Sequence, residues 1–315
     1  MVCAEIIDMN NIVASVVIPV KNAGKYLDLT LKRIFSQKAG ILFEVIIIDS
    51  GLTGNSLEIV NRYPCALYQI PEKDFNHGGT RNYGILKSSG EYILFLSQDA
   101  VPQDDFWMQN LLVNLRMDDS VAGAYSRQVP CPEASALTRI RVNSFLTASL
   151  ARRESRIDSI ERYNKLSASQ KHSFCNFDNV SSCIRRSVWQ KIRLPETDFG
   201  EDIEWAEQVL KAGYKIIYEP KSVVYHSHNF TLWQWFHRNR ANAQKLNQLF
   251  SQNYPKNIGE VLIKIFSRFY IDICNLICEE KKFSDFFCNS FKIFFYALIE
   301  GFGQYKGIQN SKRAL

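Results

Sequence analysis

The chain has 315 residues, of which 46% are hydrophobic, so it can bury one large core or one core with an appendage. Its net charge of +6 is small and its basic residues are spread out, which argues against nucleic acid as a partner and favours anionic phosphates or an anionic membrane surface. The eight cysteines show no paired metal-ligand spacing, and all but Cys3 are expected to be small buried hydrophobes in a reducing compartment.

The first residues, MVCAEIIDMNNIVAS, contain acids and no basic segment ahead of a long apolar run, which argues against a secretory signal. No stretch of the sequence reaches the roughly 18 to 20 apolar residues of a membrane-spanning helix. The sequence therefore predicts a cytoplasmic protein that is soluble or peripherally attached to a membrane.

The first half of the chain alternates predicted strands with predicted helices. Apolar, β-branched runs predict buried strands, and three-to-four-residue apolar spacing predicts helices between them. The strands are expected at residues 15–20, 43–50, 66–70 and 91–96, and the helices at 26–35, from Leu57 onward, and at 80–88. This alternation predicts a mainly parallel sheet with right-handed crossovers.

The rest of the chain has a different pattern. Residues 139–170 are polar and rich in Arg and Ser, which predicts helices and a mobile excursion. GEDIEWAEQVLKAGY predicts a helix that begins with acids and ends at Gly213, and KIIYEP and SVVYH predict strands. From Leu232 onward the pattern is almost wholly helical, and residues 258–302 are unusually aromatic.

Polar residues follow three of the predicted strands. Asn22, Asp49 and Asp99 stand at or just beyond the carboxyl ends of strands 15–20, 43–50 and 91–96. The carboxyl edge of a parallel sheet is where α/β enzymes bind their ligands. We therefore expect the three side chains to converge on one crevice.

Five blocks of sequence, in order, resemble the family-2 glycosyltransferases of the GT-A fold. They are VVIPVKN, the strand ending at Asp49, HGGTRNYGI, FLSQDAVP and FGEDIEWAEQVLKAGY. More narrowly, DFNHGGTRN, SQDAVP and VYHSHNFT resemble bacterial rhamnosyltransferases that build O-antigen and other surface polysaccharides. The resemblance covers residues 15–240 and implies an α/β fold with a single nucleotide-binding GT-A domain, followed by a C-terminal helical segment.

The resemblance implies that the strand ends hold the nucleotide and the donor sugar. Asp49 would accept a hydrogen bond from the N3–H of a pyrimidine, although an Asp that only caps its turn is the alternative. The family's second acid is replaced here by Gly54, which leaves Thr53 as the nearby candidate for a ribose contact. The other residues expected to bind the donor at strand ends are Pro19, Asn22 and Gln98.

The block HGGTRN predicts a second donor contact. Two glycines before a helix allow a close backbone approach, and the amides at a helix start favour an anion. By resemblance Gly78 and Arg81 would contact the nucleotide, and the alternative is a tight loop with a surface Arg. His77 is expected to line the site.

A divalent cation, Mg²⁺ or Mn²⁺, is implied by the block SQDAVP. The family's acidic triplet is Ser97-Gln98-Asp99 here, so one carboxylate remains, and a nucleotide diphosphate and water would supply further ligands. His226 stands where many relatives place a metal-binding His, with His228 as the fallback. Purely structural histidines are the alternative.

Glu201 and Asp202 are the candidates for catalysis. An inverting transfer needs a base within reach of the acceptor hydroxyl, and adjacent acids at a helix start can project one carboxylate while the other braces it. Acids that only complement the helix dipole are the alternative. We favour Asp202 as the base and Glu201 as its support; Asn179 and Trp205 are expected near the sugar or acceptor, and Arg240 near the diphosphate.

The predicted domains are residues 1–245, the transferase domain, and 246–315, a helical region. The C-terminal helices are apolar and aromatic with interspersed Lys and Arg, so they pack on the protein, lie in a membrane interface or form an oligomer contact.

The predicted activity is inverting, metal-dependent transfer of L-rhamnose from dTDP-L-rhamnose to a lipid-linked oligosaccharide at the cytoplasmic face of the inner membrane. A UDP-hexose or UDP-N-acetylhexosamine donor is one alternative. A non-catalytic scaffold that binds a nucleotide sugar is another.

Overall fold

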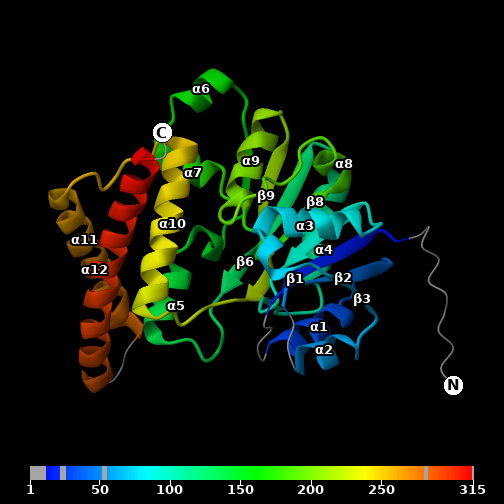
Figure 1. The fold of residues 1–315 in the computed structure, drawn as a ribbon, viewed down its shortest axis with the longest axis horizontal. Coiled ribbons are helices and arrows are strands. Elements are labelled where there is room, and N and C mark those ends of the chain that lie inside the picture. Colours follow the sequence, from blue (N-terminus) through cyan, green and yellow to red (C-terminus); the bar gives the residue numbers. More distant parts are fainter. Residues whose placement is uncertain (1–11, 22–25, 52–54, 280–282, 314–315) are drawn as a thin grey trace. The chain divides into compact units, whose positions relative to one another are not determined.

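The computed structural model describes residues 12–21, 26–51, 55–279 and 283–313 (Figure 1). Its internal contacts divide the chain into two compact units. The first comprises Met1–Arg127, Leu150–Asp158 and Phe177–Tyr225, and the second comprises Gln128–Ser149, Ser159–Asn176 and His226–Leu315. The predicted boundary between residues 245 and 246 falls inside helix α10 (Leu232–Phe250), which lies wholly within the second unit.

Within the described residues, nine strands form one sheet in the order β3-β2-β1-β4-β8-β6-β9-β5, and β7 pairs with β9. The strands are β1 (Ala14–Val20), β2 (Phe43–Asp49), β3 (Cys65–Gln69), β4 (Tyr92–Leu96), β5 (Val101–Pro102), β6 (Val121–Val129), β7 (Arg153–Arg156), β8 (Ser181–Arg185) and β9 (Lys215–Tyr225).

The sheet is parallel in its first part and antiparallel beyond it. Strand β1 pairs in parallel with β2 and β4, and β2 pairs in parallel with β3, which confirms the expected α/β alternation. Strand β8 runs antiparallel to β4 and β6, and β9 runs antiparallel to β5 and β7. KIIYEP and SVVYH, which were expected as two strands, form the single strand β9.

Helices cover both faces of the parallel part. The helices of the first unit are α1 (Leu27–Phe35), α2 (Asn55–Val60), α3 (His77–Leu86), α4 (Trp107–Met117), α8 (Arg186–Trp189) and α9 (Glu201–Lys211). Side chains of α1 and α4, such as Leu31 and Trp107, share a buried core with Val16 and Leu94 of the sheet. Because side chains alternate along a strand, Val17 points to the opposite face. There α3 approaches so closely that a Cβ on Gly84 would lie 2.3 Å from Val17 Cγ1.

The second unit is built mainly from helices. They are α5 (Ala136–Asn143), α6 (Ile160–Asn164), α7 (Ala168–Phe174), α10, α11 (Ile258–Glu279) and α12 (Phe283–Arg313). Helices α10, α11 and α12 lie side by side (Figure 1), and a Cβ on Gly307 of α12 would lie 2.2 Å from the Arg240 carbonyl oxygen of α10. The helical C-terminal region is thereby confirmed. Among the described residues, no helix combines the length and apolarity needed to cross a membrane.

Candidate active site

Helix α9 begins with the two acids that the sequence singled out. Gly200 precedes them at a φ of 69°, a left-handed conformation that favours glycine, and the helix starts at Glu201. The two carboxylates have different surroundings, because Glu201 is buried whereas Asp202 keeps part of its surface accessible.

Glu201 forms a buried ion pair with Arg81. Arg81 Nη1 donates to Glu201 Oε1 at 2.9 Å, and Asn179 Nδ2 donates to the same oxygen at 3.3 Å. Arg81 is 6% exposed, and its guanidinium also donates to the carbonyl oxygens of His77 and Asn179. The Arg81 charge is thus directed at Glu201. A direct contact between Arg81 and a nucleotide stays a prediction.

Asp202 is half-buried, and two backbone N–H groups bond to its carboxylate. Its Oδ1 accepts from the Ile203 backbone N–H at 2.8 Å, and its Oδ2 accepts from the Asn179 backbone N–H at 3.3 Å. Burial raises the pKa of Asp202 well above its usual value, and the negative charges of Glu201 and Asp178 raise it further. A carboxyl with a raised pKa is a stronger base than an ordinary Asp once it is ionised.

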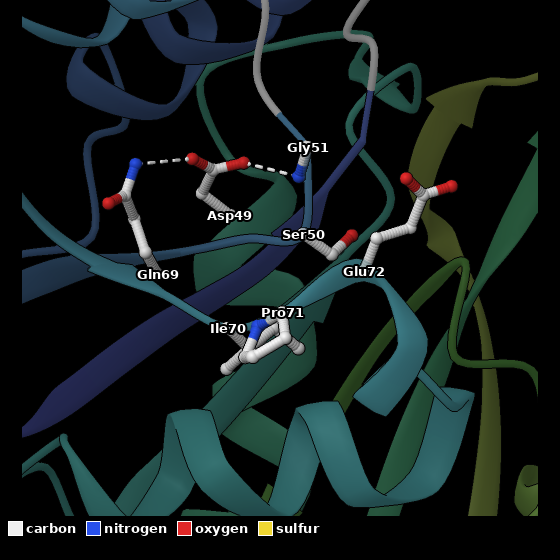
Figure 2. A pocket seen from close by; sticks show the side chains of 7 residues that line it. All are labelled: Asp49, Ser50, Gly51, Gln69, Ile70, Pro71 and Glu72. Carbon is white, nitrogen blue, oxygen red and sulfur yellow. Dashed lines mark hydrogen bonds between the residues drawn. The ribbon is translucent and has the colours of Figure 1, made fainter.

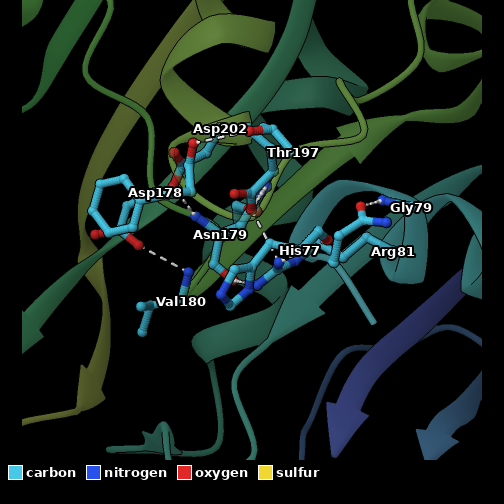
Figure 3. Close-up of polar contacts among 12 residues, drawn as sticks. His77, Gly79, Arg81, Asp178, Asn179, Val180, Thr197 and Asp202 are labelled. Atoms are coloured by element: carbon cyan, nitrogen blue, oxygen red, sulfur yellow. Dashed lines mark hydrogen bonds and ion pairs between the residues drawn. The ribbon is translucent and has the colours of Figure 1, made fainter. Parts of the chain in front are cut away.

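Asp178 is a site residue that the sequence reasoning missed. Figure 3 shows Asp178, Asn179 and Asp202 near one another, with Arg81 and His77 on the adjacent helix α3. Asp178 Oδ1 accepts from the Val180 backbone N–H at 2.8 Å. This bond closes a short turn that leads into β8. The signal was available in DNVSS, where the acid directly precedes Asn179. Asn179 itself is 1% exposed and ties the chain to both acids of α9.

The start of helix α3 is shaped by packing. Asn76 caps the helix by accepting from the Gly79 backbone N–H at 2.6 Å. A Cβ on Gly78 would lie 1.7 Å from the Pro195 carbonyl oxygen, so the close approach that this glycine permits is to the protein backbone. His77 is half-buried, and its ring packs edge-on against Phe75 at 5.2 Å.

Trp205 belongs to the core of the first unit. None of its surface is exposed, its Nε1 donates to the Ile192 carbonyl oxygen at 2.9 Å, and its ring contacts Phe177. A side chain without accessible surface cannot line an acceptor, so the core alternative accounts for Trp205. We leave it out of the site.

Asp49 lies at the carboxyl end of β2, in the wall of a pocket of about 450 Å³ (Figure 2). Its two carboxylate oxygens accept from the Gly51 backbone N–H at 2.7 Å and from Gln69 Nε2 at 3.0 Å. The pocket is lined by Asp49, Ser50, Gly51, Gln69, Ile70, Pro71 and Glu72. Pro19 is half-buried in β1, next to Ile48 of β2 in register. Asn22, Thr53 and Gly54 lie outside the described residues.

Gln98 and Asp99 follow the end of β4. The Gln98 side chain donates to the Lys21 carbonyl oxygen at 3.0 Å and accepts from the Lys21 N–H at 2.9 Å. It thereby holds the end of β1 to the end of β4. Asp99 is half-buried in the turn between β4 and β5.

His226 and His228 belong to the second unit and face each other. Their Nε2 atoms are 3.1 Å apart, and His226 Nδ1 lies 2.9 Å from Gln128 Oε1. Because an amide oxygen only accepts, His226 Nδ1 carries the proton, and Nε2 is the ring nitrogen that faces His228. Arg240, also in this unit, is half-buried on α10.

The chain is similar to characterised proteins both in sequence and in structure. Residues 15–177 match the family model described as glycosyl transferase family 2. The chain is 32% identical to the O-antigen chain rhamnosyltransferase RfbN of Salmonella typhimurium and 30% identical to WbaN of Salmonella anatum. Each match spans 228 residues, which are 71% of this chain and 69% of the relative.

Two solved structures share its fold at 14% identity. The mannosyltransferase PcManGT from Pyrobaculum calidifontis has a TM-score of 0.58, with 95% of this chain and 86% of that chain covered. TarS residues 1–349 from Staphylococcus aureus have a TM-score of 0.52, with 96% and 92% covered. These matches confirm the family and fold that the sequence predicted: the chain belongs to glycosyl transferase family 2, has the GT-A fold, and is similar to the O-antigen rhamnosyltransferases.

Proposed function

We propose that this chain catalyses inverting, metal-dependent transfer of L-rhamnose from dTDP-L-rhamnose to a lipid-linked oligosaccharide. The observation that carries the proposal is the half-buried Asp202, whose carboxyl has a raised pKa, beside the buried Glu201–Arg81 pair. The donor sugar is inferred from the similarity to the rhamnosyltransferases RfbN and WbaN.

In the proposed reaction, ionised Asp202 takes the proton from an acceptor hydroxyl. The oxygen of that hydroxyl forms a bond to the anomeric carbon, and the bond to the diphosphate breaks with its electron pair on the leaving oxygen. Attack from the face opposite the diphosphate inverts the anomeric configuration. Glu201 and Asn179 hold Asp202 in place, since Asn179 bonds to both acids.

The histidine pair fits a divalent cation. Imidazole nitrogens are common ligands of divalent transition metals, and His226 and His228 present two Nε2 atoms at close range. A cation held by the two histidines would neutralise charge on the leaving diphosphate. The PcManGT structure was determined in complex with GDP-Man and Mn²⁺.

The donor pocket makes a testable prediction about Asp49. Replacing Asp49 by Ala removes the acceptor proposed for the pyrimidine N3–H, so the affinity for dTDP should fall about tenfold or more. Thermal stabilisation by a panel of nucleotide sugars measures this, and dTDP-L-rhamnose should stabilise the wild type most. Glu72→Gln removes a charge from the same pocket wall and should leave dTDP affinity within about twofold.

Two other outcomes of the nucleotide-sugar panel would contradict this proposal. Preferential stabilisation by a UDP-hexose or UDP-N-acetylhexosamine would replace the donor assignment. Stabilisation by a nucleotide sugar without donor hydrolysis or transfer, with Mg²⁺ or Mn²⁺ present, would favour the non-catalytic scaffold.

We further propose that α11 and α12 place the enzyme on an anionic membrane that carries its acceptor. Helix α11 is apolar on both sides, since Val261 and Ile265 are buried while Ile263, Phe266 and Tyr270 are 61%, 63% and 69% exposed. Lysines 256, 292 and 306 are exposed on this unit, and lysines are attracted to anionic lipid.

Replacing Phe266 and Tyr270 together by Gln should lower binding to phosphatidylglycerol vesicles about tenfold or more, because two large apolar side chains no longer enter the interface. Vesicle co-sedimentation measures the effect. Met117→Gln, an 82% exposed apolar position on α4, is the control and should bind as the wild type does. Unchanged vesicle binding, with a dimer that the double variant dissociates on gel filtration, would show that a second copy covers this face.

A further inference from the structure

The segment between β9 and α10, residues 226–230, carries both histidines and has no regular secondary structure. Its first residues are nevertheless held by the end of β6 and by the chain that follows it. The His226 backbone N–H donates to the Val129 carbonyl oxygen at 2.9 Å, and the His226 ring bonds to Gln128. Ser227 Oγ accepts from the Cys131 backbone N–H at 3.0 Å.

The end of the segment is held by helices α5 and α12. Asn229 Oδ1 accepts from Thr138 Oγ1 at 2.7 Å and from the Ser135 backbone N–H at 3.2 Å, both at the start of α5. The Phe230 carbonyl oxygen accepts from the Tyr296 hydroxyl on α12. His228 thus lies between two anchored residues, Ser227 and Asn229.

Helices α5 and α12 are in turn locked together by a buried charge cluster. Arg141 of α5 is 6% exposed, and its Nη2 lies 3.6 Å from Asp272 of α11 and 3.6 Å from Glu300 of α12. The guanidinium also stacks on Trp235 at 4.2 Å and on Tyr296 at 5.1 Å. Tyr296 therefore joins this cluster through its ring and the histidine segment through its hydroxyl.

We propose that Tyr296 and Thr138 are positioning residues for the histidine pair, so that helices α5 and α12 set the metal affinity of the enzyme. The inference rests on the proposed function in one respect, the assignment of His226 and His228 as metal ligands. Two ligands on an irregular segment bind a metal tightly only when their backbone is already ordered, because ordering it on binding costs conformational entropy. Asn229 and Phe230 supply that order through their bonds to α5 and α12.

The test measures Mn²⁺ affinity on the full chain, by the loss of the free Mn²⁺ electron paramagnetic resonance signal. Tyr296→Phe removes the hydroxyl and keeps the ring on Arg141, and it should weaken Mn²⁺ binding about fivefold, the usual effect of one lost hydrogen bond. Thr138→Val removes the other anchor and should act in the same direction. Tyr305→Phe, a half-buried tyrosine on the same helix, is the matched control and should bind Mn²⁺ as the wild type does.

His226→Ala separates this inference from the metal assignment. If His226→Ala keeps wild-type Mn²⁺ affinity, the metal assignment fails. If it loses Mn²⁺ binding while Tyr296→Phe and Thr138→Val both keep wild-type affinity, the histidines are ligands and the positioning role is wrong. Melting temperatures are compared throughout, and a weakening of Mn²⁺ binding that Tyr305→Phe reproduces would identify a general effect of the helix and overturn the proposal.

Discussion

Asp202→Asn should lower turnover by about a hundredfold to ten-thousandfold, the usual contribution of a positioned base. The amide keeps the shape of the side chain and can still accept one of the two backbone bonds, from Ile203 or from Asn179, but it cannot take a proton from the acceptor hydroxyl at neutral pH. The affinity for the nucleotide should change little, because the pocket at Asp49 is formed by other residues. Steady-state kinetics with donor and acceptor, together with donor binding, measures both effects.

Glu201→Gln is the matched comparison. Glu201 is buried against Arg81, so the neutral amide leaves the Arg81 charge without its partner and should lower stability. Its effect on turnover, compared at temperatures where both variants are folded, should be smaller than that of Asp202→Asn. The reverse order would exchange the two roles. Wild-type turnover in both variants would show that Glu201 and Asp202 only begin the helix and that neither acts in catalysis.

The raised pKa of Asp202 adds a pH dependence with a definite sign. The base works when ionised, so kcat/KM should rise with pH and level off above the pKa of Asp202 in the folded enzyme. Because that pKa lies above the unfolded value, the folded state binds the extra proton, and its stability falls as pH rises between the two values. The stability of Asp202→Asn relative to the wild type should therefore be greater at neutral pH than at a pH below both values, as thermal unfolding would reveal.

Asp99→Ala should lower turnover by about a hundredfold to a thousandfold, because a metal at a phosphoryl leaving group contributes several kcal/mol to the transition state. The variant should also bind dTDP more weakly in the presence of Mg²⁺ or Mn²⁺, whereas dTDP affinity in chelator should match the wild type. Activity measured across a metal titration and nucleotide binding with and without metal test both statements.

Asp105→Ala is the control for Asp99. Asp105 lies a few residues along the same chain and forms exposed ion pairs with Arg33 and Lys38, so its loss should change turnover by less than about twofold. If Asp99→Ala retains wild-type turnover and metal dependence, the residues after β4 only end the strand.

Much of the fold could be predicted because its signals are local. The apolar runs at β1, β2, β3 and β4 are strands within one or two residues of the predicted ends. Helix α9 begins at the predicted acids, since adjacent carboxylates complement a helix start. Asp49 also lies at its expected strand end, because a buried strand followed by a turn can be recognised from consecutive residues.

The sequence by itself determined the family, the parallel half of the sheet and the identity of the acids at α9, because each depends on neighbouring residues or on blocks in a known order. Only the tertiary structure decided that Arg81 pairs with Glu201, that Gly78 packs on Pro195 and that Trp205 is core. Asp178 and the anchors of the histidine segment also emerged only there. These contacts join residues that are far apart in the chain, and their energies depend on burial and on distances that no local pattern encodes.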